Sequence, residues 1–367
     1  MRYSSIDVLR MLAIFVMVLV HFCENLSGYK LPFSGFGAPL FAFLSGVSYR
    51  LWSQARQAKG VTDEEIFKIS VRRGLFVFGV GFAFNILVWM PEDTFNWDVL
   101  TFIGAALLLL GVVRKLPLPV LAVMAAMSLL VSPILRALAD YDAYWVLGYL
   151  DGDLTLSDLL IGFLAVGYFP FFPWICFSLT GYIASAWLFA EPDDELDEAD
   201  EPPPAVWPLL LAGALLAGAS GALLAAGPYL PVVVTTHVLR GWTMFPPTVE
   251  YVSGMLGYTL LLFGASHWAI DGRPWAMRFP GVLNIAKTFS QYSFTIYVLH
   301  HVVHLWPLWI YGVATGHEAT YYWMKAMPVA AAIALALLFL LVCFLGLRLL
   351  GSQRTYGIES GMRWLCD

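Results

Sequence analysis

The sequence predicts an all-α protein, a polytopic integral membrane bundle of about ten transmembrane helices with both termini in the cytosol. Hydrophobic residues make up 60% of the 367 residues and charged residues only 13%, about half of the charged share that soluble domains carry. The mean hydropathy is +0.74. About ten apolar runs are long enough to cross a hydrocarbon core of roughly 30 Å as helices.

The predicted spans follow one another in a single integral membrane domain, residues 1–367. The sixth span contains Pro170 and Pro173, which predict a kink or an interfacial lead-in. No inverted repeat of the kind that marks many transporters is found. The spans are expected at residues 6–23, 36–53, 73–91, 97–113, 118–138, 160–189, 206–226, 249–270, 291–312 and 326–350.

The distribution of Lys and Arg predicts the orientation. With the N-terminus inside, sixteen of the 20 Lys and Arg residues fall on the cytosolic side. Cytosolic loops of membrane proteins carry such an excess of positive charge. The four residues left on the outer side are Lys30, Arg136, Arg240 and Lys325.

Most of the net charge of −6 belongs to one loop. Eight acidic side chains lie between Glu191 and Glu201, and without them the balance would be slightly positive. Residues 191–204 are expected to be a solvated, acidic, Pro-rich cytosolic linker. The basic residues lie beside spans instead of forming one patch, so no nucleic-acid partner is expected.

The first span carries the most informative pair, Arg10 and His21. Asp7 and Arg10 interrupt its apolar run, so a retained span is expected and not a cleaved signal peptide. Eleven steps of about 100° bring His21 back to the stripe of Arg10, about 16 Å further along the helix. Charged and titratable residues inside a bilayer cost free energy, which favours a functional role for Arg10 and His21. The alternative is an Arg whose side chain reaches the interface and a structural His. Glu24, three residues beyond His21, is expected to orient the imidazole so that it can act as a base.

Two further charged groups have alternative interpretations. Arg50, Arg72 and Arg73 border a cytosolic loop, where guanidinium groups would suit the phosphates of a nucleotide-type donor such as coenzyme A. The positive-inside rule alone also predicts a basic cluster there. Asp98 begins the fourth span, where it either caps that helix or faces His21 as a catalytic group.

The ninth span places Tyr297, His300, His301 and His304 on one side, at i, i+3, i+4 and i+7. A proton-handling or acceptor-binding role for Tyr297, His300 and His304 is favoured over a metal site. His300 and His304 have the spacing of a metal pair, but no third ligand is evident in the sequence, so no metal is expected.

An aromatic outer segment between the seventh and eighth spans contains Arg240 and Trp242. It suits the recognition of a sugar or headgroup, and an interfacial aromatic belt is the alternative.

Several stretches resemble the transmembrane acyltransferase superfamily, which includes the acyltransferase 3 family and the heparan-α-glucosaminide N-acetyltransferase-like proteins. The first span is similar to the Arg-x10-His helix of the acyltransferase 3 family. Stretches similar to the heparan-glucosaminide branch are Ala38-Pro39-Leu40-Phe41 through Ser45-Gly46, Arg72-Arg73-Gly74, Phe169 to Trp174 with Gly181, Phe245-Pro246-Pro247-Thr248, and Tyr292-Ser293 with Tyr297 and His300.

The resemblance implies that an acetyl or short acyl group moves from cytosolic acyl-CoA to a carbohydrate acceptor, an amino sugar or a hydroxyl, on the extracytoplasmic side. Arg10 and His21 would hold the essential roles, with His21 as general base or acyl carrier. The lysosomal branch has its histidine in the loop after this helix, and residues 23–36 contain none, so His21 is expected to do that work.

Acyl-CoA is therefore expected as co-substrate, in a bacterial inner or plasma membrane, with a homodimer as a compatible assembly. The alternative function is a proton-coupled membrane transporter, because intramembrane His, Arg and carboxylates also form proton relays.

Overall fold

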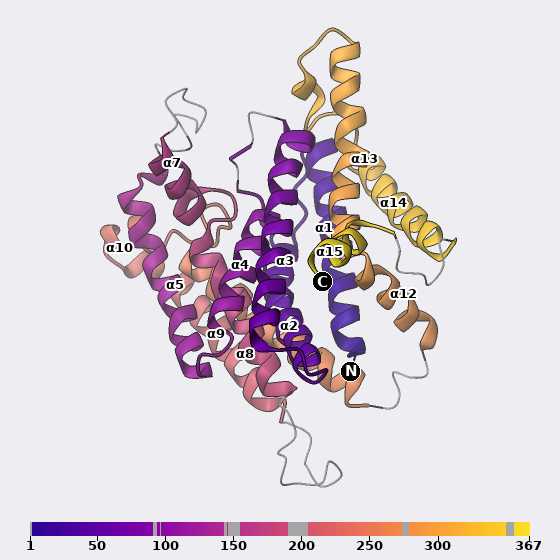
Figure 1. Ribbon diagram of the computed structural model, residues 1–367. Coiled ribbons are helices and arrows are strands. Elements are labelled where there is room, and N and C mark those ends of the chain that lie inside the picture. The colour runs from indigo at the N-terminus through magenta and orange to yellow at the C-terminus, as the bar shows by residue number, and fades with distance from the viewer. Residues whose placement is uncertain are drawn as a thin grey trace. The chain divides into compact units, whose positions relative to one another are not determined.

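The computed structural model of the protein describes residues 2–90, 94–95, 97–142, 145, 155–189, 205–273, 279–349 and 356–367. These residues form helices and connecting turns, and none of them forms a β-strand (Figure 1). The predicted acidic linker 191–204 lies outside the described residues. The chain divides into two compact units: unit 1 holds Ala42–Ala83 and Thr94–Ala269, and unit 2 holds Arg2–Phe41, Phe84–Asp93 and Ile270–Asp367.

Unit 2 is built around the first helix, α1, which packs against α12, α13 and α14 (Figure 1). The α1 helix ends at Gly28, whose φ of 70° is the left-handed conformation that glycine adopts readily. The helices of this unit are α1 (Ser4–Ser27), the π-helical turn η1 (Asn85–Trp89), α12 (Pro280–Gln291), α13 (Ser293–Ala314), the 3-10 turn η7 (Ala319–Tyr322), α14 (Val329–Leu349) and α15 (Ile358–Cys366).

The segment after η7 is hydrogen-bonded to the C-terminal end of α1. The backbone N–H of Met324 donates to the carbonyl of Asn25 at 2.8 Å, and Ala326 donates to the carbonyl of Leu26 at 2.8 Å. The last carbonyls of a helix have no partner within the helix, so these bonds satisfy them. They also hold the chain that follows α13 against the end of α1.

The N-terminal end of α13 is satisfied by a side chain from α15. The Glu359 carboxylate accepts from the backbone N–H groups of Phe294 at 2.7 Å and Thr295 at 3.0 Å. A carboxylate at this end of a helix pairs the free N–H groups and complements the helix dipole. The last helix of the chain therefore helps to position the helix that carries three histidines.

Unit 1 is a bundle in which α5 packs on α8 and α9 packs on α11. The α2 helix begins in unit 2 and continues into unit 1, and η5 passes from unit 1 to unit 2. The helices are α2 (Gly37–Gln57), α3 (Asp63–Phe84), α4 (Val99–Val113), α5 (Leu118–Leu138), α7 (Leu156–Ile161), η3 (Gly162–Val166), α8 (Phe171–Leu188), α9 (Trp207–Ala226), η4 (Gly227–Tyr229), α10 (Val232–His237), α11 (Val249–Ser266) and η5 (His267–Asp271).

Small residues let α2 and α8 approach at backbone distance. A Cβ atom at Gly46 would lie 1.8 Å from the carbonyl oxygen of Ser178, and one at Gly181 would lie 2.0 Å from that of Phe43. The Ser45 and Ser178 hydroxyls are 3.0 Å apart. Close packing through small residues is a typical way for membrane helices to associate.

Six helical runs among the described residues are long and apolar enough to cross a membrane. They are α1, Asp63–Trp89, α5, α8, Trp207–Tyr229 and α14. Each of the ten predicted ranges overlaps a helix, and the third begins ten residues after the start of α3 at Asp63. The figure of about ten spans and the cytosolic termini stay predictions.

The sixth predicted range, 160–189, is not one helix. η3 ends at Val166 and α8 begins at Phe171, so the predicted interruption is confirmed and the continuous span is wrong. Pro170 is the reason, because it lacks an N–H group and disfavours helical geometry in the residue before it.

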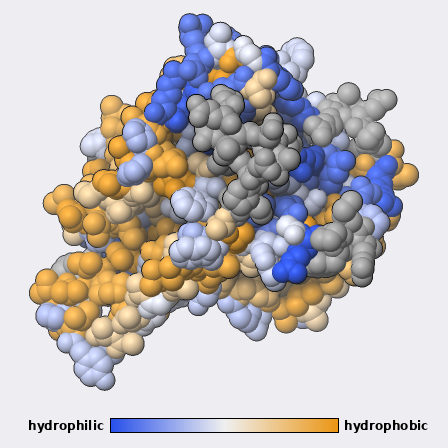
Figure 2. Space-filling model, turned by 90° about the horizontal axis from the view of Figure 1, so that it is seen from below, coloured by the Kyte–Doolittle hydropathy of each residue, from blue (hydrophilic) through white to orange (hydrophobic). Residues whose placement is uncertain are grey.

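Large apolar side chains cover much of the surface that Figure 2 shows. Leu138 on α5 is 80% exposed and Leu349 on α14 is 88% exposed. Exposed apolar surface of this extent favours aggregation in water, whereas a protein in lipid normally exposes it. The surface therefore agrees with the composition in indicating a multi-pass membrane protein.

Candidate functional site

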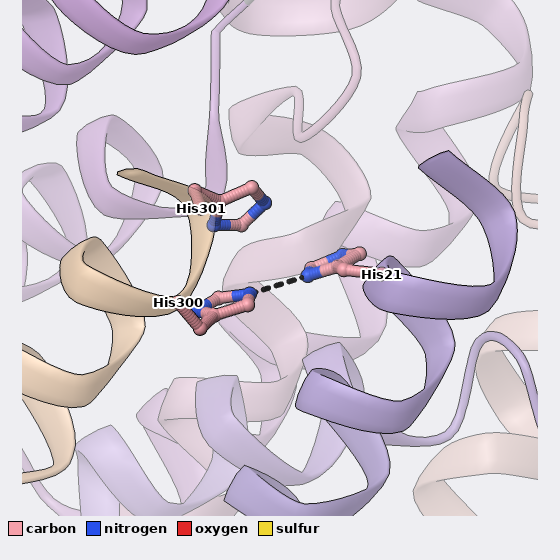
Figure 3. A group of neighbouring side chains, drawn as sticks. All are labelled: His21, His300 and His301. Carbon is pink, nitrogen blue, oxygen red and sulfur yellow. Dashed lines mark hydrogen bonds between the residues drawn. The ribbon is translucent and has the colours of Figure 1, made fainter. Parts of the chain in front are cut away.

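Three histidines from two helices of unit 2 meet in one cluster, which we call the histidine cluster: His21, His300 and His301 (Figure 3). The Nδ1 atom of His21 on α1 lies 2.9 Å from the Nε2 atom of His300 on α13. The His21 ring is tilted against that of His301, with centroids 4.5 Å apart. His300 and His301 are fully buried and His21 is half-buried. Residues 279 positions apart in the sequence therefore form one polar centre.

The hydrogen bonds of the cluster assign the proton positions. The Nδ1 atom of His300 lies 3.1 Å from the carbonyl oxygen of Ile296. A carbonyl can only accept, and a neutral imidazole has one N–H group and one lone pair. Nδ1 of His300 therefore donates, its Nε2 accepts from Nδ1–H of His21, and the lone pair of His21 is left on Nε2.

This series of hydrogen bonds is an arrangement that orients a histidine base in many enzymes. One ring nitrogen has a hydrogen-bond partner, and the other carries a reactive lone pair. Here the orienting group is a second imidazole, which is itself held by a backbone carbonyl. The expected partner was Glu24, and that expectation is wrong. The His21 ring contacts His300 on α13, whereas the Glu24 carboxylate lies 3.9 Å from Nζ of Lys30 in the loop that follows α1.

His304 forms a separate, fully paired layer next to the histidine cluster. Its Nδ1–H donates to the carbonyl of His300 at 2.5 Å, and its Nε2 accepts from the Asn25 side-chain amide at 2.9 Å. The Asn25 carbonyl oxygen in turn accepts from Trp323 Nε1–H at 3.2 Å. Each of these polar groups has a hydrogen-bond partner. Together the bonds connect α1, α13 and the segment that follows η7.

Tyr297 is the last member of the predicted stripe on α13. Its ring is 5.7 Å from that of His300 and 5.4 Å from that of His301, measured between centroids. Tyr297, His300, His301 and His304 are all buried, which confirms that they share one side of the helix. The expected role of His300 in binding an acceptor changes, because its lone pair is occupied by His21.

Arg10 lies on the same helix as His21, as the spacing predicted, since α1 is continuous from Ser4 to Ser27. Its Nη1 donates to the Ser290 hydroxyl at 3.3 Å. Nearer the N-terminus, the Asp7 carboxylate receives two hydrogen bonds from Arg2, at 2.7 and 2.9 Å. Arg10 therefore faces α12.

The predicted basic groups Arg50, Arg72 and Arg73 belong to unit 1. The Arg73 guanidinium lies over the Trp52 ring at 4.5 Å, and Arg50 lies over the Tyr182 ring at 5.6 Å. Arg72 is 3.8 Å from Glu65. Arg56 also lies over Trp52, at 5.9 Å. Arg50, Arg56 and Arg73 therefore each lie over an aromatic ring of α2 or α8, a contact worth about 0.5–2 kcal/mol per pair.

Asp98 caps α4. Its side chain accepts from the backbone N–H of Leu100 at 3.0 Å, which confirms the capping alternative and gives the residue a structural purpose in unit 1.

Arg240 and Trp242 lie in the segment between α10 and α11. Arg240 Nη2 is 2.9 Å from the Asp142 carboxylate. Burial raises the pKa of the neighbouring Tyr141 to about 12, so that its phenol stays protonated and can donate. The Trp242 ring packs edge-on against Tyr251, with centroids 5.5 Å apart, and stays 42% exposed. An exposed ring beside an ion pair is available for stacking.

The sequence prediction missed two contributors, His301 as a contact of His21 and Asn25 as the partner of His304. His301 was visible in the α13 stripe, but its contact with α1 was not, because periodicity within one helix says nothing about which helix lies opposite. Asn25 offered only a weak signal, a polar residue one turn after His21.

Residues 2–217 match the family model described as the heparan-alpha-glucosaminide N-acetyltransferase catalytic domain. No curated protein is significantly similar to the chain. The matched region includes α1 with His21 and Arg10, and α13 lies beyond its end. The match covers more than half of the 367 residues and favours a transferase over the transporter alternative. The chain belongs to the family of heparan-alpha-glucosaminide N-acetyltransferase catalytic domains and is a multi-pass membrane protein of this transferase family.

Proposed function

We propose that this protein is an acyl-CoA-dependent membrane acyltransferase, in which His21 acts on an acetyl or short acyl group taken from cytosolic acyl-CoA. The acceptor is a carbohydrate amine or hydroxyl on the extracytoplasmic side. The observation that carries the proposal is the ordered chain from the Ile296 carbonyl through His300 to His21. In this arrangement Nδ1–H of His21 donates to His300, and Nε2 of His21 keeps its lone pair.

As general base, Nε2 of His21 takes the proton from the acceptor O–H or N–H while the acceptor atom attacks the thioester carbonyl carbon. The C–S bond then breaks, and the coenzyme A thiolate leaves and recovers the proton from His21. Proton transfer of this kind contributes typically 10²–10⁴-fold to a rate. The bond from Nδ1–H to His300 stabilises the imidazolium that forms, since its charge is shared along the chain.

As acyl carrier, Nε2 of His21 attacks the thioester carbonyl carbon, the C–S bond breaks, and the coenzyme A thiolate leaves and takes up a proton from the imidazole. The acceptor then attacks the acyl carbon, the N–acyl bond breaks, and the proton of the acceptor returns to the imidazole. The two routes differ in one observable. Labelled acetyl-CoA incubated without acceptor leaves label on the protein after a rapid quench only if the acyl-histidine route operates.

The donor side of the proposal uses Arg10, Arg50, Arg72 and Arg73. Guanidinium groups bind phosphate through paired hydrogen bonds, so we assign Arg50, Arg72 and Arg73 to the phosphates of coenzyme A. Arg10 would meet the pantetheine arm, about 16 Å below His21 along α1. For the acceptor, Trp242 supplies an exposed ring for stacking on a sugar, beside Arg240 in the same segment.

The test is release of free coenzyme A from acetyl-CoA by the purified full-length protein in detergent, with amino sugars and sugar alcohols as acceptors. His21→Ala is expected to lower turnover by roughly 10²–10⁴-fold, and Arg10→Ala to raise KM for acetyl-CoA. His317→Ala is the matched control, because His317 is an exposed histidine stacked on Tyr321 at 4.0 Å. Equal turnover by the wild type and His21→Ala contradicts the proposal, as does a wild type that neither binds nor consumes acyl-CoA.

A further inference from the structure

The histidine cluster has the composition of a metal site. One ligand nitrogen from each of His21, His300 and His301 lies within 4.8 Å of the others. His300 is 0% exposed and His301 is 1% exposed. Three imidazoles at this separation exceed what a single base and its orienting partner require.

Backbone hydrogen bonds orient two of these rings as ligands. Nδ1–H of His300 donates to the carbonyl of Ile296 at 3.1 Å, and Nδ1–H of His301 donates to that of Tyr297 at 3.3 Å. Both Nε2 atoms therefore carry lone pairs. Histidine ligands of metals typically donate their other N–H to a carbonyl or carboxylate in this way, which fixes the tautomer and the direction of the lone pair.

The three rings differ from His304 in what occupies their lone pairs. The Nε2 lone pair of His304 is taken up by the Asn25 amide. The lone pair of His300 meets only the N–H of His21, and no hydrogen bond reaches Nε2 of His301 from the part of the chain that the structure describes. Among the described residues, the Nε2 lone pair of His301 is therefore open to a ligand, and that of His300 accepts only one exchangeable proton, from His21.

Imidazole donors select the class of ion. Neutral nitrogen ligands suit Zn²⁺, Cu²⁺, Ni²⁺ and Co²⁺, whereas Mg²⁺ and Ca²⁺ require oxygen ligands. A Zn–N bond of about 2.0–2.1 Å places tetrahedral ligand atoms roughly 3.3 Å apart. Nitrogen atoms within 4.8 Å reach that separation through side-chain movements of about 1–1.5 Å. Three histidines with a fourth position for water form a common zinc coordination set.

We propose that His21, His300 and His301 bind a divalent transition-metal ion of the zinc class, and that its binding excludes the His21–His300 hydrogen bond. The ion takes Nδ1 of His21 and Nε2 of His300 and His301. The proton of His21 moves from Nδ1 to Nε2, so the ring stays neutral and no proton is lost. His21 then has no lone pair for an acceptor. Resting on the proposed function, this makes the ion an inhibitor of acyl transfer.

Metal binding is measured first, on the full-length detergent-solubilised protein without a histidine tag, after chelation and removal of the chelator. Co²⁺ is titrated while the visible d–d absorption of tetrahedral cobalt is recorded, and Zn²⁺ is used to displace it. We expect one Co²⁺ per chain and displacement by Zn²⁺. His301→Gln is expected to weaken binding by more than about tenfold, since it removes a ligand. His317→Gln, the exposed control, is expected to bind as the wild type does.

Absence of tetrahedral cobalt absorption in the wild type, or equal binding by His301→Gln, overturns the inference. His300→Gln is the second ligand variant, and thermal unfolding of each purified variant without metal confirms that it is folded. A variant that does not fold is replaced by the Asn substitution at the same position. Retained binding by folded variants at both positions contradicts the site in the same way.

The inhibition is measured separately as coenzyme A release with and without Zn²⁺. We expect Zn²⁺ to suppress turnover by the wild type, a chelator to restore it, and the residual turnover of His301→Gln to resist Zn²⁺. Cobalt binding without any turnover would leave the metal site intact and contradict the proposed function. Turnover without cobalt binding would do the reverse. Binding without inhibition would show that His21 does not act through the lone pair assigned to it.

Discussion

Replacing His300 by phenylalanine tests whether a second imidazole orients His21. The substitution keeps a ring of similar size in a fully buried position but removes the acceptor that lies 2.9 Å from Nδ1 of His21. The N–H of His21 then has no protein partner on α13, and the Nδ1–H tautomer loses its advantage. We expect a lower rate of acyl transfer because fewer molecules carry the lone pair on Nε2.

The magnitude follows from the cost of an unpaired buried donor. Leaving a buried polar group unsatisfied costs about 1–3 kcal/mol. At 25 °C this corresponds to roughly a 5- to 150-fold change in an equilibrium between tautomers. The expected fall in kcat therefore lies in that range, below the roughly 10⁴-fold effect of losing a charged carboxylate partner in a serine protease, because His300 is neutral. KM for acetyl-CoA should change little.

The assay is steady-state release of free coenzyme A by His300→Phe, by His300→Gln and by the wild type. A glutamine carbonyl accepts a hydrogen bond, so His300→Gln should recover a large part of kcat. The exposed control is His317→Phe. Full activity of His300→Phe would refute the orienting role. Equal loss in His300→Phe and His300→Gln, both folded by thermal unfolding, would refute the hydrogen bond as its cause.

Three structural predictions accompany this one, each measured as thermal or denaturant unfolding in detergent. Gly46→Ala should destabilise by at least about 1–3 kcal/mol, because the new Cβ would lie 1.8 Å from the Ser178 carbonyl; Gly79→Ala, with nothing within 4 Å, should be neutral, and equal effects would contradict the packing. Glu359→Ala should lower stability by about 1–3 kcal/mol by freeing two N–H groups of α13, with Glu359→Gln in between; an unchanged unfolding midpoint would show that α13 does not need this cap. Asp98→Ala should cost about 0.5–2 kcal/mol and Asp98→Asn much less, and a similar loss in both would point to charge and away from capping.

The helices were the most predictable part of the fold. Each predicted span overlaps a helix, although the sixth is broken between η3 and α8, because the required length of about 20 apolar residues is a property of the local sequence. Pro170 marked the one interruption correctly. The two short helices of unit 2, α12 and α15, were not predicted, since each is too short for a span and its position depends on the helices it packs against. Glu359 gave no local sign that it caps α13.

The candidate site was predictable in part, for the same reason. The sequence by itself determined that Arg10 and His21 share a stripe of one helix and that three histidines share a side of another, because helical periodicity depends only on residue spacing. It also determined the family, through motifs in their order along the chain. Only the tertiary structure decided that His21 bonds to His300 and not to Glu24, and that His301 joins them. Those contacts arise where α1 packs against α13, and helix-on-helix packing depends on shape and small residues throughout the unit, which no single segment encodes.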